Sequence, residues 1–207
     1  MTHLNHHRRW AALALALSLS LLTPWVAQAQ NAPTPASAST PKVRISTSMG
    51  DIEAELYADK APKTVANFVQ YVNDKHYEGT IFHRVIPGFM LQGGGYDGQY
   101  REKKTRAPVV HEGRQALAAG LKNTTGTLAM ARTNDPQSAT AQFFINVVDN
   151  AFLDPSFQSF GYTVFGKVTS GMDVVQKIRN TPTGTGGPFP TDVPRTPVVI
   201  QSISLLK

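Results

Sequence analysis

Residues 80–95 constrain the fold of this 207-residue chain more than any other stretch. Their sequence, TIFHRVIPGFMLQGGG, begins with a run of β-branched and aromatic residues, which predicts a strand. Pro87-Gly88 then indicates a turn, because proline presets the backbone of a turn residue and glycine accepts positive φ. A second apolar run follows. The stretch therefore predicts two antiparallel strands joined by a short connection.

An arginine, Arg84, stands in the middle of the first of these strands. Strand alternation would place its side chain on the same face as Phe82 and Ile86, and it would turn His83 to the opposite face. An arginine among aromatic, sulfur and amide side chains suits a shallow site for a neutral, partly apolar ligand. The alternative is an ordinary surface arginine whose aliphatic stem lies on apolar neighbours.

The N-terminus has the three parts of a secretory signal peptide. Arg8 and Arg9 precede a short apolar run at 11–22, and Ala27-Gln28-Ala29 matches the A-x-A cleavage pattern. The apolar run is too short to cross a bilayer, which needs about 20 residues. We therefore expect residues 1–29 to be a signal peptide that directs export to the periplasm, with the extracellular space as the alternative.

A linker and one domain follow the signal. Residues 30–41 (QNAPTPASASTP) are uncharged and lack large apolar side chains, which is typical of a flexible linker. Residues 42–207 contain the remaining strand and helix patterns and have an ordinary length for a single domain. We expect no membrane association once the signal has been removed.

Charge and cysteine content exclude several function classes. The formal net charge is +6, and loss of Arg8 and Arg9 with the signal would lower it to +4. Lysines and arginines are scattered without a recognition motif, so we expect no nucleic-acid partner. The chain contains no cysteine, which excludes disulfides, thiol nucleophiles and thiolate metal ligands.

The rest of the domain alternates strand patterns with two helical ones. We expect a β-hairpin over 42–57 and amphipathic helices over 61–73 and 171–179. Residues 96–125 show no sustained period and indicate a long loop. Further strands are expected at 126–131, 142–147, 163–168 and 196–206. These elements predict a mainly β fold, a closed eight-stranded antiparallel barrel capped by two α-helices.

The strand expected at 142–147 shows the clearest alternation. One face carries Phe143, Ile145 and Val147 and should lie in the core. The other face carries Gln142 and Phe144, which repeats the aromatic and amide chemistry of residues 80–95. The two segments therefore have the side chains to form one site.

These segments resemble the cyclophilin family of peptidyl-prolyl cis/trans isomerases, from about residue 42 to 206. FHRVIPGFMLQGGG is similar to the family signature, and GTLAMAR, AQFFIN, FLD and YTVFGKV follow in the family's order. DNAFLD with SFGYTVFGKV resembles the bacterial exported members. The resemblance implies a cyclophilin-like barrel and an enzyme that accelerates rotation about X-Pro bonds in exported proteins and so assists their folding.

The resemblance also implies roles for individual residues. The catalytic residues would be Arg84, Gln92 and Phe89, with His83 as structural support. The substrate-binding residues would be Met90, Ala131, Arg132, Gln142, Phe144, Phe152, Leu153 and Tyr162. No cofactor or metal is implied. The expected partners are proline-containing unfolded or partly folded polypeptides, and we expect a monomer.

Two positions depart from the pattern of many eukaryotic members. Phe152 falls where they carry tryptophan, so we expect only weak cyclosporin binding, because an indole N–H donor is missing. Tyr162 falls where they carry histidine, which would alter that contact. Both changes resemble the bacterial branch of the family.

Other function classes fit less well. Residues 93–98 (GGGYDG) match the dinucleotide pattern G-x-G-x-x-G, but the polar QYREKK that follows does not open an apolar helix. No G-x-S-x-G motif is present, and His76, His83 and His111 lack metal-ligand spacing. The alternative that stays open is a non-catalytic chaperone module that binds proline peptides without accelerating isomerisation.

Overall fold

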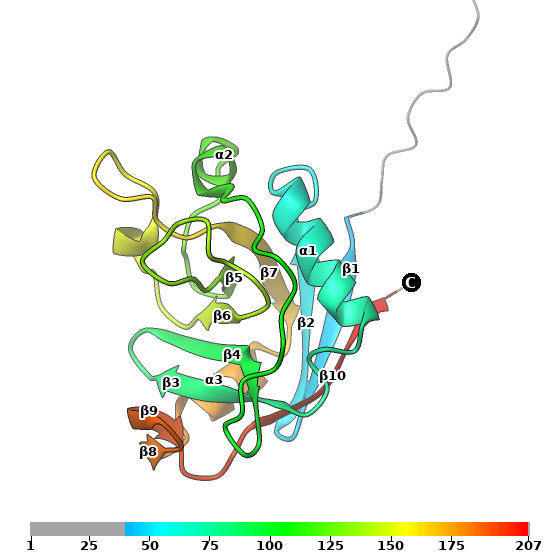
Figure 1. The fold of residues 1–207 in the computed structure, drawn as a ribbon, viewed down its shortest axis with the longest axis vertical. Helices are drawn as coiled ribbons and strands as arrows, with labels where there is room; N and C mark the ends of the chain where they lie inside the picture. The colour runs from blue at the N-terminus through cyan, green and yellow to red at the C-terminus, as the bar shows by residue number, and fades with distance from the viewer. Residues whose placement is uncertain (1–39, 207) are drawn as a thin grey trace, which may run out of the picture. The chain divides into compact units, whose positions relative to one another are not determined.

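A computed structural model describes residues 40–206. Eight strands close into one barrel in the order β1-β10-β3-β4-β6-β5-β7-β2 (Figure 1). Their bounds are β1 (Lys42–Thr47), β2 (Gly50–Leu56), β3 (Thr80–Ile86), β4 (Met90–Asp97), β5 (Thr127–Met130), β6 (Phe143–Asn146), β7 (Val164–Ser170) and β10 (Val199–Leu206). The predicted closed antiparallel barrel is confirmed. The predicted signal peptide and most of the predicted linker lie outside the described residues.

Three helices accompany the barrel: α1 (Pro62–Asn73), α2 (Gly113–Ala118) and α3 (Met172–Arg179). The first and third match the two predicted helices, and each buries apolar side chains in the main core. The second lies in the segment predicted to be a loop. It has only six residues, too few for a helical period to stand out in the sequence. A short 3-10 helix, η1 (Ala151–Leu153), follows β6.

A separate two-stranded sheet, β8 (Thr183–Gly186) and β9 (Phe189–Pro194), lies outside the barrel and packs on β3. The sequence does not predict it, because its residues are mostly Gly, Pro and Thr and lack the apolar alternation of a strand. The hairpin covers the face of β3 that carries His83.

Buried side chains form two clusters. The larger fills the barrel and the space under α1 and α3, and it takes Phe143 and Ile145 from β6. The smaller cluster takes Phe144 from β6, together with Met90 and Leu153. The alternation predicted for β6 is therefore confirmed, and its second face supports a different part of the molecule.

The alternation predicted for β3 is wrong, because the strand contains a bulge. Phe82 pairs with Gly93 and Arg84 pairs with Gln92, so β3 advances two residues while β4 advances one. The extra residue, His83, reverses the direction of the side chains that follow it. Phe82 consequently lies in the barrel core, while Arg84 is exposed. The bulge thus brings Arg84 out to the surface opposite Gln92.

Candidate active site

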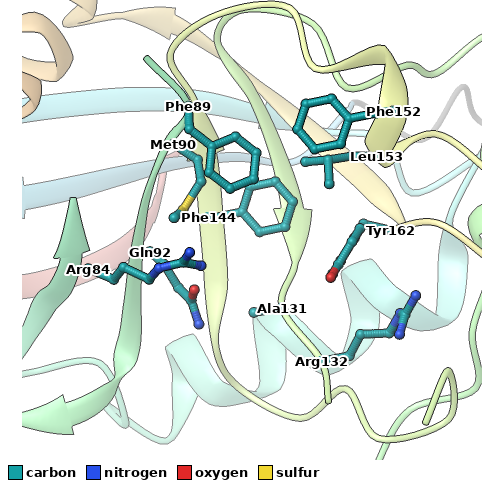
Figure 2. A pocket seen from close by; sticks show the side chains of 10 residues that line it. All are labelled: Arg84, Phe89, Met90, Gln92, Ala131, Arg132, Phe144, Phe152, Leu153 and Tyr162. Atoms are coloured by element: carbon teal, nitrogen blue, oxygen red, sulfur yellow. The ribbon is translucent and has the colours of Figure 1, made fainter. Parts of the chain in front are cut away.

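A pocket of about 340 Å³ opens beside β4 and β6 (Figure 2). It brings together ten of the predicted site residues from five separate parts of the sequence. Met90, Phe144 and Leu153 are buried and form an apolar floor. The lining consists of Arg84, Phe89, Met90, Gln92, Ala131, Arg132, Phe144, Phe152, Leu153 and Tyr162. Such a mixture of apolar walls and a few polar groups is typical of a ligand site.

Arg84 supplies a positive charge at the edge of this pocket. Its guanidinium carbon lies 6.0 Å from the centre of the Phe89 ring. Within residues 40–206, every ion pair uses a cation other than Arg84. Figure 2 shows its guanidinium beside Gln92, with the aromatic wall next to both. The donors of Arg84 are therefore available to a ligand bound in the pocket.

Gln92 is held by a second amide. Its Nε2 donates a 2.9 Å hydrogen bond to Oε1 of Gln142. Gln142 does not line the pocket; it lines an adjoining hollow of about 350 Å³ that shares Gln92, Ala131 and Arg132. A Cβ at Gly95 would lie 2.5 Å from the Gln142 side chain, so any larger residue there would displace Gln142. Gln142 thus lies next to Gln92 in the adjoining hollow, and its predicted role in substrate binding stays a prediction.

The aromatic wall is built from two contacting pairs. The rings of Phe89 and Phe152 are stacked with centres 5.5 Å apart. The rings of Phe144 and Tyr162 meet edge to face at 5.6 Å. Aromatic pairs in these geometries stabilise each other by about 0.5–1.5 kcal/mol beyond their buried area. The wall is therefore held together by contacts between its own rings.

Arg132 differs from Arg84 because its donors are already occupied. Its Nε and Nη2 donate to the carbonyl oxygen of Gly161 at 3.0 and 2.9 Å, and its Nη1 donates to that of Thr133 at 2.7 Å. Its guanidinium also lies over the Tyr162 ring, 4.6 Å from the centre. Arg132 thus stabilises one side of the pocket by linking Tyr162 to the backbone at Gly161 and Thr133.

A buried asparagine positions the pocket wall and is not among the predicted site residues. Nδ2 of Asn150 donates to the backbone oxygen of Phe89 at 2.9 Å and to Oδ1 of Asn146 at 2.7 Å. Both asparagines are almost fully buried. The sequence feature that could have indicated Asn150 is its position directly before the apolar residues 151–153. A polar side chain that is buried beside such a run needs a specific hydrogen-bond partner.

His83 lies behind the pocket, under the β8–β9 hairpin. Its ring stacks on Phe189 at 5.1 Å and meets Tyr96 at 4.7 Å. Burial, and then the neighbouring charge of Arg84, lower the pKa of His83 to about 4. The imidazole is therefore neutral at physiological pH. Its predicted supporting role stays a prediction, and its position is consistent with packing between β3 and the hairpin.

Residues 40–206 lack the features of two other kinds of site. No group of three or more His, Asp or Glu side chains in this part of the chain is arranged to hold a metal ion. None of its helices is long and apolar enough to span a membrane. The pocket beside Arg84 is the site that the predicted residues share.

Comparison with known proteins identifies the family. The family model described as cyclophilin type peptidyl-prolyl cis-trans isomerase/CLD matches residues 42–205. The chain belongs to the cyclophilin family. The peptidyl-prolyl cis-trans isomerase of Acinetobacter baylyi is 55% identical over 79% of this chain and 84% of the relative. Isomerase A of Dickeya dadantii is 49% identical over 95% of this chain and 96% of the relative.

Solved cyclophilin structures match the fold as well. A cyclophilin type peptidyl-prolyl cis-trans isomerase of Cryptosporidium parvum has a TM-score of 0.64 and 27% identity, and the match covers 81% of this chain and 98% of that one. The structure determined in the presence of the dipeptide Ala-Pro has a TM-score of 0.63, with 80% and 99% covered. The family predicted from the sequence is confirmed.

Proposed function

We propose that this cyclophilin is a peptidyl-prolyl cis/trans isomerase that acts on proline-containing unfolded or partly folded polypeptides. The observation that carries the proposal is the Arg84 guanidinium, which forms no ion pair within residues 40–206 and lies beside an apolar hollow. Relatives about 50% identical are named as isomerases of this kind, which supports the same activity here. The hollow can hold a pyrrolidine ring while leaving the preceding peptide group near Arg84.

The chemistry requires stabilisation of a twisted amide. Rotation about the peptide bond has a barrier of about 18–20 kcal/mol, because it breaks amide resonance. In the twisted state the prolyl nitrogen becomes pyramidal and regains a lone pair. A fixed cationic donor interacts with that lone pair more strongly than with the planar ground state, and this difference lowers the barrier. In our proposal Arg84 is that donor.

The other residues of the pocket fix the substrate. Phe89, Met90, Phe144 and Leu153 would hold the proline ring, while Gln92 would hydrogen bond to the substrate backbone. With the ring held, rotation would move the chain that precedes the proline. No covalent bond is made or broken, so this mechanism needs no cofactor.

We propose further that the physiological substrates are exported polypeptides whose folding the enzyme assists in the periplasm. The support is the signal-peptide pattern of residues 1–29. Cell fractionation tests this, together with mass spectrometry of the N-terminus. The proposal expects a periplasmic chain that begins at Gln30. An uncleaved chain in the cytoplasm would contradict it.

A protease-coupled isomerisation assay on an Ala-Pro peptide tests the activity. The mature protein should shorten the slow cis-to-trans phase in proportion to its concentration. If the rate stays at the uncatalysed value while the peptide still binds, the protein is instead a non-catalytic proline-binding chaperone. The same preparation should sediment as a monomer, which is our proposal for its oligomeric state.

A further inference from the structure

The loop 154–161 projects from the molecule directly beside the pocket; in Figure 1 it is the yellow loop that follows η1. It leaves the pocket wall at Leu153 and returns to it at Tyr162. The Tyr162 N–H donates to the Leu153 carbonyl at 2.9 Å, which closes the base of the loop. Any partner of this loop therefore lies next to a ligand in the pocket.

Hydrogen bonds hold this loop in one shape. Within it, the Ser156 N–H donates to the Ser159 carbonyl at 2.8 Å, and the Ser159 N–H donates to Ser156 Oγ at 3.1 Å. From outside it, Arg114 donates to the Ser156 carbonyl at 3.0 Å. Gly161 has φ +63°, and a Cβ there would lie 2.3 Å from the Pro155 nitrogen. Ser156 and Ser159 thus take part in hydrogen bonds that fix the conformation of the loop.

The phenylalanines at and near this loop point into solvent instead. Phe157 is 99% exposed, Phe152 is 72% exposed and Phe160 is 52% exposed. Phe160 is partly covered by Arg114, whose guanidinium lies 5.9 Å from the ring centre. Large apolar side chains that are exposed together at one loop mark an interaction surface. We call Phe152, Phe157 and Phe160 the aromatic surface.

We propose that the aromatic surface is a second docking site for the same client polypeptide whose proline occupies the pocket, and that it binds apolar side chains of the client. This inference rests on the proposed function. Continuity identifies the occupant, because the loop that carries Phe157 and Phe160 begins and ends at the pocket residues Leu153 and Tyr162. A hollow of about 210 Å³ between Phe160, Arg114 and Val110 offers room for one such side chain.

Chain geometry limits where the client's apolar residues lie. The loop tip is at most about four residues from either end of the loop, which corresponds to a reach of roughly 13 Å. An extended client covers that distance in about four residues. The aromatic surface should therefore select clients with aromatic or large aliphatic residues within about four positions of the proline. A second contact of this kind would also raise the residence time of unfolded clients over that of short peptides.

The test compares two peptides on three proteins. The variants are Phe157→Ser with Phe160→Ser, and Leu205→Ser as the matched control, because Leu205 is an exposed apolar residue of β10. Fluorescence anisotropy gives the affinity for a short Ala-Pro peptide and for a longer peptide with phenylalanine about four positions before and after the proline. The double variant should bind the longer peptide roughly tenfold more weakly and the short one normally. The control should bind both normally.

Equal affinity of the wild type and the double variant for the longer peptide would overturn the proposal, as would equal losses on both peptides. Phe157→Ser alone should produce part of the loss, and its side chain has no packing whose removal could unfold the domain. Wild-type protein that co-sediments with phosphatidylglycerol vesicles through these phenylalanines, with unchanged peptide affinity, would also overturn it.

The Arg84→Ala background separates this inference from the proposed function. Both proposals are supported if Arg84→Ala loses isomerase activity and still binds the longer peptide more tightly than the short one, by the same factor as the wild type. If the wild type does not isomerise but the double variant still loses affinity for the longer peptide, only the proposed function fails. If the wild type isomerises the peptide normally and the double variant binds the longer peptide as tightly as the wild type does, only the proposal for the aromatic surface fails.

Discussion

Gln92 and Gln142 are joined by a side-chain hydrogen bond of 2.9 Å between Nε2 and Oε1. The bond occupies a donor of Gln92 and orients its amide at the edge of the pocket. Gln142 itself lines the adjoining hollow and does not line the pocket. We infer that Gln142 is a positioning residue for Gln92.

Replacing Gln142 with leucine should therefore impair turnover without unfolding the domain. Loss of one neutral hydrogen bond is worth about 1 kcal/mol, so kcat/KM on an Ala-Pro peptide should fall about fivefold. Gln142→Glu keeps an acceptor for Gln92 and should restore most of the rate. Wild-type kcat/KM in Gln142→Leu, or equal losses in both variants, would show that the bond has no positioning role.

Asn150 should be required for stability as well as for activity. Asn150→Leu would leave the buried Asn146 Oδ1 without this donor, whereas the Phe89 carbonyl would keep the Val147 N–H at 3.2 Å. An unsatisfied buried polar group costs about 1–3 kcal/mol. Urea denaturation should show a loss of that size in the free energy of unfolding, with an unchanged m-value. A stability equal to the wild type would mean that other donors replace the asparagine.

Stability should fall as the pH is lowered from about 7 toward 4. The pKa of His83 is lowered to about 4, first by burial and then by Arg84, while the unfolded chain has the ordinary value near 6.5. Between these values the unfolded state binds a proton that the folded state does not, so acid favours unfolding. The loss should be on the order of 3 kcal/mol for this group.

His83→Phe provides the control for that pH dependence. The substitution keeps an aromatic ring between Phe189 and Tyr96 but removes the titrating group. Urea denaturation at pH 4.5 and pH 7 should give a smaller difference for this variant. Burial also lowers the pKa values of His76 and His111, so some dependence should remain. If the stability of His83→Phe depends on pH as strongly as that of the wild type, the loss of stability at low pH does not come from His83.

Cyclosporin affinity should depend on the residue at position 152. Phe152 lies at the edge of the pocket and its side chain has no hydrogen-bond donor. We propose that cyclosporin binds weakly for this reason, and that Phe152→Trp, which adds an indole N–H, raises the affinity roughly tenfold. Isothermal titration with both proteins measures the change. Tight binding to the wild type would contradict the explanation.

The sequence predicted the barrel where side-chain alternation is regular. In β6, Phe143 and Ile145 face the main core and Phe144 faces the pocket, as their spacing indicates. In β3 the same reasoning failed at Phe82, because a bulge at His83 changes the register and depends on pairing with β4. A bulge is set by contacts between strands, and the alternation of a single strand carries no sign of it.

Other features could not be predicted because they depend on distant partners. The β8–β9 hairpin is composed mostly of Gly, Thr and Pro residues and packs on β3. The positions of Gln142 and Asn150 depend on contacts with Gln92 and Phe89, which are distant in sequence. The pocket lining was predicted from the family motifs, whereas the arrangement of its supporting residues required the structure.

The most direct test of the account is the turnover of Arg84→Ala on an Ala-Pro peptide, measured with a thermal unfolding control. Arg84 is exposed and forms no ion pair within residues 40–206, so the variant should keep the stability of the wild type. The account predicts that kcat falls by about 10²–10³, the usual effect of removing one preorganised transition-state donor, while peptide affinity changes little. A folded Arg84→Ala protein with the wild-type kcat would contradict it.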